Sequence, residues 1–155
     1  MRAGGDPLGL PPPEAKGRWQ RAQVVGAIYL ADTAATAWAA FHRALAEPGL
    51  PPDHLLPRDL WRYELALQRV VDLGYPEKLT AAGLPTALQQ SSQWPMYQAI
   101  RGRLAATGAE GVLSGSAAGP GHRCVCVFAA ALDRLTPIGR ERIELAPPPP
   151  RGMRT

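Results

Sequence analysis

Apolar runs of two kinds predict where the chain forms strands. Residues 24–30 form a short, β-branched apolar run, which is typical of a buried strand. Residues 60–67 alternate polar and apolar side chains, the pattern of a strand with one exposed face. Residues 112–113 and 123–128 are further apolar runs, and residues 132–145 are expected to supply one last strand. The chain is therefore expected to contain several short strands.

Apolar residues at helical spacing predict two helices between these strands. The first begins at Asp32 or Thr33, because either side chain can cap the free backbone amides of a helix. It extends to about Glu47 and ends at the Pro-Gly pair of residues 48–49. The second helix covers about residues 95–107, where apolar residues recur at the same spacing.

Two segments fit neither spacing. Residues 70–83 are expected to form a loop with a short helical turn, and the glycine-rich residues 115–121 are expected to join two strands. The expected strands and helices do not alternate as regular βαβ units. The pattern therefore predicts an α+β fold or an irregular α/β fold.

Length and proline content predict one domain with extended ends. The chain has 155 residues, 46% of them hydrophobic, which is enough for a single packed core. Prolines cluster at residues 11–13 and 147–150, a composition typical of extended backbone. We expect a flexible N-terminal segment at 1–15, one compact domain at 16–146 and a Pro/Arg-rich tail at 147–155.

Charge and hydropathy argue against two classes of partner. The formal net charge is +4, with arginines near the C-terminus that could attract an acidic partner. No basic-aromatic recognition motif accompanies them, which argues against direct nucleic-acid binding. The sequence contains neither an apolar run of about eighteen residues nor a signal peptide. We therefore expect no membrane contact and a cytoplasmic location.

The chain has two cysteines, Cys124 and Cys126, which lie two positions apart on an expected strand. Residues with that spacing share a face and are badly placed to form a disulfide with each other. No set of ligands with metal-binding spacing accompanies them, so we expect buried thiols and no metal.

Three residues have a chemical reason to form a binding site. Arg18 follows Gly17, so its guanidinium could hold a pyrophosphate where the glycine lets the backbone approach closely. Tyr29 closes the first strand, where its ring could stack on a nicotinamide and its hydroxyl could reach a ribose. Ser116 lies in a turn of small residues whose free amides could bind an anion.

Each of these residues also has an ordinary interpretation. Arg18 would be a surface arginine in a flexible segment, and Tyr29 a core tyrosine with a satisfied hydroxyl. Ser116 would then be part of a structural turn. His122, beside the last glycine of the turn, has a possible functional interpretation too.

Seven blocks of the sequence stand in the order found in one known family. They are residues 17–19 (GRW), 29–31 (YLA), 36–39 (TAWA), 61–63 (WRY), 71–73 (VDL), 94–100 (WPMYQAI), and 108–113 (GAEGVL) leading to 116–117 (SA). This arrangement resembles the RES-domain family, the toxins of bacterial RES–Xre type II toxin–antitoxin systems. The resemblance covers about residues 16–137.

The resemblance implies a fold, a substrate and a partner. It implies a fold like that of ADP-ribosyltransferases and consumption of NAD by cleavage of the nicotinamide–ribose bond. ADP-ribose then passes to water, phosphate or a protein. It also implies catalytic and NAD-binding roles for Arg18, Tyr29 and Ser116, with Gly17 beside them in the NAD site. The implied partner is an Xre-type antitoxin that covers the cleft.

The chain departs from the family pattern in two places. The family has a catalytic glutamate on the helix after the tyrosine strand, and the matching residue here is Ala40. Asp32, Glu47 and Glu64 are the acids considered as substitutes, and Glu47 is expected to be too far away. Members of the family also begin with a further strand. Either the start of this chain lies upstream, or its domain lacks that first strand.

Three functions stay open from the sequence. The first is an active toxin that degrades NAD or transfers ADP-ribose. The second is a catalytically impaired relative that binds a nucleotide or the antitoxin through the same cleft. The third, an unrelated basic domain associated with DNA, has the least support.

Overall fold

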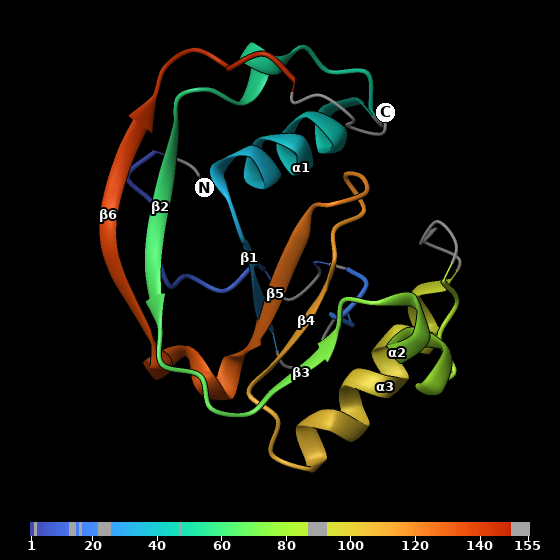
Figure 1. Ribbon diagram of the computed structural model, residues 1–155. Helices are drawn as coiled ribbons and strands as arrows, with labels where there is room; N and C mark the ends of the chain where they lie inside the picture. The colour runs from blue at the N-terminus through green and yellow to red at the C-terminus, as the bar shows by residue number, and fades with distance from the viewer. Residues whose placement is uncertain are drawn as a thin grey trace.

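The computed structural model describes residues 1, 3–12, 15, 17–21, 26–46, 48–86 and 93–149. It has an α+β fold in a single compact domain (Figure 1). The strands are β1 (Ala27–Ala31), β2 (Arg58–Leu65), β3 (Val70–Leu73), β4 (Gly111–Gly115), β5 (Arg123–Phe128) and β6 (Leu135–Ile143). The helices are α1 (Ala34–Ala46), α2 (Pro76–Ala81) and α3 (Trp94–Ala106), with 3₁₀ turns at Pro52–Leu55 and Ala129–Arg134.

The strands form two separate sheets. A four-stranded sheet has the order β1-β5-β4-β3, in which only the β3–β4 pair is parallel. The chain makes that parallel connection through α2 and α3, because a tight turn would bring the second strand back antiparallel and parallel strands need a longer crossover. The second sheet is a long antiparallel ribbon of β2 and β6, with a register shift between Arg62 and Tyr63.

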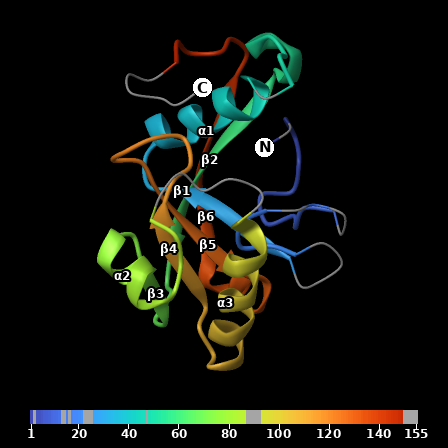
Figure 2. The same cartoon turned by 90° about the vertical axis from the view of Figure 1, so that its right-hand side faces the viewer.

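The side chains of β5 alternate between two cores. Cys126 and Phe128 face a cluster that includes residues of α2 and α3, whereas Val127 and the partly buried Val125 belong to a cluster that includes Leu135 of β6. This alternation follows from the two-residue period of a strand. The four-stranded sheet is therefore the middle layer, with α2 and α3 on one face and the ribbon on the other (Figures 1 and 2).

Local chemistry sets the ends of α1. Thr33 caps its first turn, because Thr33 Oγ1 accepts a hydrogen bond from the Thr36 backbone N–H at 3.1 Å. At the other end, Gly49 has a φ of 68°, which favours glycine. Asp32 and Thr33 were both predicted as possible caps, and in the structure the cap is Thr33. Asp32 is exposed and is not used in this way.

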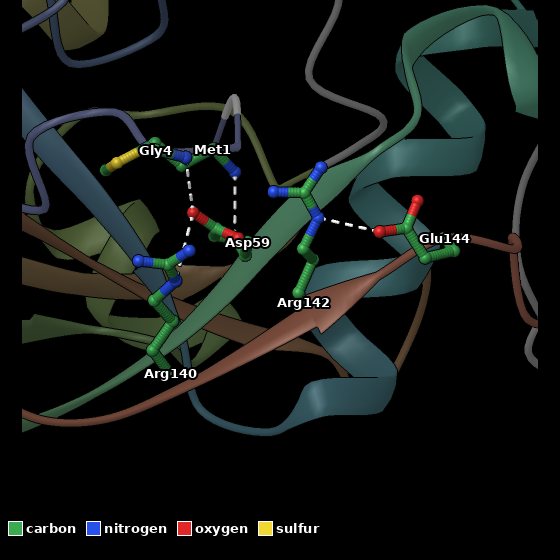
Figure 3. A network of polar contacts seen from close by, with 6 residues as sticks. All are labelled: Met1, Gly4, Asp59, Arg140, Arg142 and Glu144. Carbon is green, nitrogen blue, oxygen red and sulfur yellow. Dashed lines mark hydrogen bonds and ion pairs between the residues drawn. The ribbon is translucent and has the colours of Figure 1, made fainter.

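The ribbon buries one carboxylate at the N-terminal segment (Figure 3). The Asp59 side chain is 0% exposed, and its Oδ2 accepts a hydrogen bond from the Gly4 N–H at 2.7 Å. Arg140 Nε lies 3.3 Å from the same oxygen. The backbone of Met1 also pairs with that of Asp59, through bonds of 3.1 and 3.2 Å. These contacts attach Met1 and Gly4 to the ribbon, while the expected domain boundaries stay a prediction.

Most expected elements are present, with shifted ends. The strand expected at 24–30 is β1, although residues 22–25 lie outside the described part of the chain. Residues 70–83 differ most from expectation, because they form β3 and α2 rather than mainly a loop. The last strand begins at Leu135 instead of Leu132, after a 3₁₀ turn. In the described part of the chain, no helix is long and apolar enough to cross a membrane.

Candidate functional site

A tight turn at Gly17–Gln20 brings two side chains into the molecule beside β4. Gly17 N donates to Gln20 O at 2.9 Å, and Gln20 N donates to Gly17 O at 3.1 Å. Gln98 of α3 fixes this turn, because its Nε2 donates to both carbonyl oxygens, at 3.0 and 3.1 Å. Arg18 and Trp19 occupy the middle of the turn, and both are buried.

Arg18 uses one edge of its guanidinium to contact β4. Its Nη2 donates to Ser114 Oγ at 3.0 Å and to the Gly115 carbonyl at 2.8 Å. Cys124 Sγ, on the neighbouring strand β5, lies 3.8 Å from the same nitrogen. Only 8% of Arg18 is exposed, so the interpretation as a surface arginine is wrong.

The rest of the guanidinium is buried without a partner among the described residues. Nε and Nη1 of Arg18 are covered from solvent and make no hydrogen bond to any residue that the structure describes. Among the described residues, no acidic side chain forms an ion pair with Arg18. Its neighbours are instead the rings of Trp19 and Tyr97, whose centroids lie 5.8 and 5.6 Å from Cζ. A buried cation in such surroundings favours the approach of an anion.

Tyr29 completes the group through its hydroxyl. Tyr29 Oη accepts a hydrogen bond from the Trp19 backbone N–H at 2.8 Å. A Cβ added to Gly17 would lie 2.9 Å from the same oxygen, so this close approach requires a glycine. Burial of the hydroxyl raises the pKa of Tyr29 well above its ordinary value and keeps it protonated. The residue as a whole is still 40% exposed, so part of its ring is open to a ligand.

The structure brings Gly17, Arg18 and Tyr29 together, and it places Ser116 just beyond them. Ser116 follows the end of β4, and its Oγ accepts a hydrogen bond from the Ala118 N–H at 3.2 Å. No contact joins its hydroxyl to Arg18 in the described part of the chain. The role of Ser116 in binding or catalysis therefore stays a prediction. We use the term Arg18 site for Gly17, Arg18, Trp19, Tyr29 and Ser114.

The glycine-rich turn after β4 is tied to the start of α1. His122 Nδ1 lies 2.9 Å from Thr36 Oγ1, and this threonine hydroxyl accepts a hydrogen bond from Thr33 Oγ1 at 3.0 Å. Because a threonine hydroxyl can both donate and accept, either tautomer of His122 can form this contact. His122 therefore has a structural contact that holds the turn against α1.

Ala40, at the position where the resemblance implies a glutamate, lies one helical turn after Thr36 on the same face of α1. It is exposed. Of the acids considered as substitutes, Glu64 belongs to the β2–β6 ribbon, and Glu47 lies outside the described residues. Asp32 follows β1 directly, is exposed and has no capping role. It is the acid that remains nearest in sequence to Tyr29.

Three residues with contacts in this region were not predicted from the sequence as site residues. Ser114 was not predicted because the resemblance pointed to Ser116, two positions later and just beyond the end of β4. Gln98 was expected only as part of a helix, and nothing in the sequence indicates that it clamps the Gly17–Gln20 turn. Thr36 belongs to one of the blocks that carry the resemblance, but its contact with His122 was not expected because the two residues are far apart in the chain.

A separate cavity of about 280 Å³ lies between α1 and β2. Its lining is mainly apolar and comes from Met1, Ala37, Trp38, Phe41, Ala44, Leu55, Arg58, Asp59 and Leu60. None of the four residues expected to bind NAD lines it. The described residues contain no group of three or more acidic, histidine or cysteine side chains placed to hold a metal ion.

Comparison with known proteins agrees with this architecture. A chain in the crystal structure of the M. tuberculosis MbcT–MbcA toxin–antitoxin complex has a similar fold, with a TM-score of 0.80 and 22% sequence identity. The similarity covers 93% of the present chain and 81% of that chain. At this level of identity it establishes the α+β fold. No curated protein matches the sequence.

The fold and the buried arginine beside β4 define the class of protein as a single α+β domain with a candidate anion site. The sequence matches the RES domain over residues 4–146, and the chain therefore belongs to the RES domain family.

Proposed function

We propose that this chain is a toxin-type RES-domain protein that binds NAD at the Arg18 site and cleaves the nicotinamide–ribose bond. The observation that carries the proposal is the guanidinium of Arg18, buried with two nitrogens unpaired. A pyrophosphate supplies two negative charges and several acceptor oxygens, which suit an arginine better than any neutral ligand does. Because Nε and Nη1 are covered, a phosphate reaches them only after a neighbouring group moves.

The neighbouring residues suit the other end of such a ligand. The ring of Tyr29 is partly exposed next to Arg18, and an aromatic ring can stack on a nicotinamide. The protonated Tyr29 hydroxyl can act as a donor but not as a base. In the proposed reaction the C–N bond between ribose and nicotinamide breaks, and nicotinamide leaves with the electron pair. Water, phosphate or a protein nucleophile then bonds to the ribose carbon and loses its proton.

The reaction develops positive charge on the ribose, as in glycoside hydrolysis. A carboxylate near that carbon stabilises the charge in the transition state, and Ala40 cannot supply one. This substitution favours a second candidate function. In that function the chain is a catalytically impaired relative that still binds a nucleotide or an antitoxin. Asp32 is the described acid that could partly replace the missing group.

We further propose that the partner is an Xre-type antitoxin that covers the Arg18 site. Two findings support a partner of this class: membership of the RES domain family, and a fold similar to a chain of a toxin–antitoxin complex. The match to the RES domain does not support the third function considered, a basic domain associated with DNA. We expect the antitoxin to prevent access of NAD when it is bound.

The test is nicotinamide release from NAD by the purified full chain, freed of any partner, at high protein concentration. If the chain is an active toxin, nicotinamide release from NAD should be measurable. The same hypothesis predicts that Ala40→Glu raises the rate by roughly a hundredfold or more, because a charged group is restored where charge develops. Ala46→Glu, at another exposed alanine of α1, is the matched control and should leave the rate unchanged.

The outcomes separate the two candidate functions. No release by the natural chain, with binding of NAD retained, would contradict the hypothesis of an active toxin and support the impaired relative. Neither binding nor release, in a protein that unfolds cooperatively, would contradict both the active toxin and the nucleotide-binding form of the impaired relative.

A further inference from the structure

Ser114 lies where β4 meets the turn that carries Arg18. It is fully buried, with 0% exposure, and its register partner on β5 is Cys124. Its Oγ accepts hydrogen bonds from two side chains, Arg18 Nη2 at 3.0 Å and Trp19 Nε1 at 3.2 Å. Its own proton is left for Cys124 Sγ, 3.7 Å away. The hydroxyl thus uses its full hydrogen-bonding capacity.

These bonds determine the orientation of Arg18. A guanidinium is planar, so its orientation is fixed once one nitrogen is held at two acceptors. Ser114 Oγ and the Gly115 carbonyl are those acceptors, and both engage Nη2. The consequence is that Nε and Nη1 are the nitrogens left without partners.

We propose that Ser114 is a positioning residue that orients Arg18 toward the anionic part of the nucleotide. The inference rests on the proposed function, because it assumes that the anion on Arg18 belongs to NAD or ADP-ribose. It assigns to Ser114 a role that is different from the one expected of Ser116. Ser114 acts through Arg18, whereas the Ser116 hydroxyl accepts a hydrogen bond from the Ala118 N–H and has no described contact with Arg18.

The test is a double-mutant cycle read by calorimetric titration of ADP-ribose into the full chain. Ser114→Ala should weaken binding about tenfold, because a hydrogen bond that holds a charged group is lost. In the Arg18→Met background the same substitution should change binding by less than about twofold, since there is no guanidinium left to orient. Thr80→Ala, which removes an exposed hydroxyl of α2 that donates to the Pro76 carbonyl, serves as the control and should leave binding unchanged.

A purely structural role of Ser114 would give a different result. If Ser114→Ala only loosened the fold, it would weaken binding equally with and without Arg18. Thermal unfolding of each variant identifies any that fail to fold. Ser114→Thr retains the hydroxyl and should restore most of the affinity, which keeps the test decisive if the alanine variant is unstable.

The outcomes for the inference and for the proposed function can be distinguished. Binding by the wild type that Ser114→Ala leaves unchanged would overturn the role of Ser114 alone. Equal losses in the two backgrounds would overturn it as well. Failure of the folded wild type to bind ADP-ribose or NAD would overturn the proposed function, and this inference with it.

Discussion

Arg18 and Asp59 are both charged side chains buried in the protein, but they differ in whether an opposite charge lies next to them. Asp59 receives a cation and a backbone donor at one oxygen, from Arg140 and Gly4. Arg18 receives neutral acceptors at one nitrogen and no counter-charge among the described residues. Asp59 lies where the ribbon meets the N-terminal segment, and Arg18 lies between the four-stranded sheet and α3.

This difference distinguishes a charge that joins parts of the fold from one that is available to a ligand. Removing a charge from water costs free energy unless a partner compensates for it. The charge of Asp59 is compensated by Arg140, although its Oδ1 has no hydrogen-bond partner among the described residues, so its contribution should be to stability. Arg18 lacks a compensating charge, so its contribution should be to binding.

The largest effect should come from Arg18→Met, which keeps the length of the side chain and removes its charge. Affinity for ADP-ribose should fall roughly a hundredfold, because two charge-assisted contacts are lost. The free energy of unfolding should change by less than about 1 kcal/mol, since an uncompensated buried charge is replaced by an apolar group. Calorimetric titration and urea unfolding measure the two quantities. A large loss of stability with unchanged affinity would contradict the assignment of Arg18 to ligand binding and would indicate a structural role instead.

Asp59→Ala should have the opposite profile. It should lower the free energy of unfolding by about 1–3 kcal/mol, because buried donors lose their acceptor, and leave affinity for ADP-ribose unchanged. Arg142→Ala is the matched control, since its pair with Glu144 (2.7 Å, Figure 3) is exposed and should contribute less than about 1 kcal/mol. Equal losses for the two variants in urea unfolding would show that burial of Asp59 does not matter.

The reactivity of the two cysteines should report on access to the Arg18 site. Iodoacetamide should modify Cys124, which is partly exposed beside Arg18, well before Cys126. Burial raises the pKa of Cys126 to about 12, so its reactive thiolate is scarce near neutral pH. ADP-ribose should slow the reaction of Cys124. Peptide mass mapping over time checks both points, and faster modification of Cys126 would contradict them.

The smallest effect should be in acid, at the partly exposed pair of Lys78 and Asp72. Lys78 and the Gly74 N–H hold the pKa of Asp72 below its ordinary value of 3.8. The stabilisation by Asp72 is therefore complete above that value and is lost as the pH falls through the lowered pKa. It should amount to less than about 1 kcal/mol. Urea midpoints of wild type and Asp72→Asn should converge at low pH, and a constant difference would contradict this.

The sequence predicted the parts of the fold that depend on local patterns. The apolar run of β1, the cap residue Thr33 and the glycine at 49 are local signals, and each appears in the structure near its expected place. β3 was missed because it pairs with β4 in a parallel arrangement, and that partner lies far away in the chain. Parallel pairing leaves no turn signal in the sequence.

The candidate site was predictable only in part, for the same reason. Gly17 was expected to let the backbone approach a ligand, whereas in the structure the close approach is to the Tyr29 hydroxyl, and the role of Gly17 in ligand binding stays a prediction. The burial of Arg18 was not expected, because it depends on Ser114 and Gln98, which are distant in sequence. The resemblance pointed to Ser116, whereas the contacts with Arg18 come from its neighbour two positions earlier.

A structure of the chain in complex with ADP-ribose would test the central claim most directly, since the claim concerns which atoms the anion meets. The account predicts phosphate oxygens within about 2.7–3.2 Å of Nε or Nη1 of Arg18, with Nη2 still bonded to Ser114 and Gly115. A phosphate bound elsewhere, with Nε and Nη1 still unpaired, would contradict it.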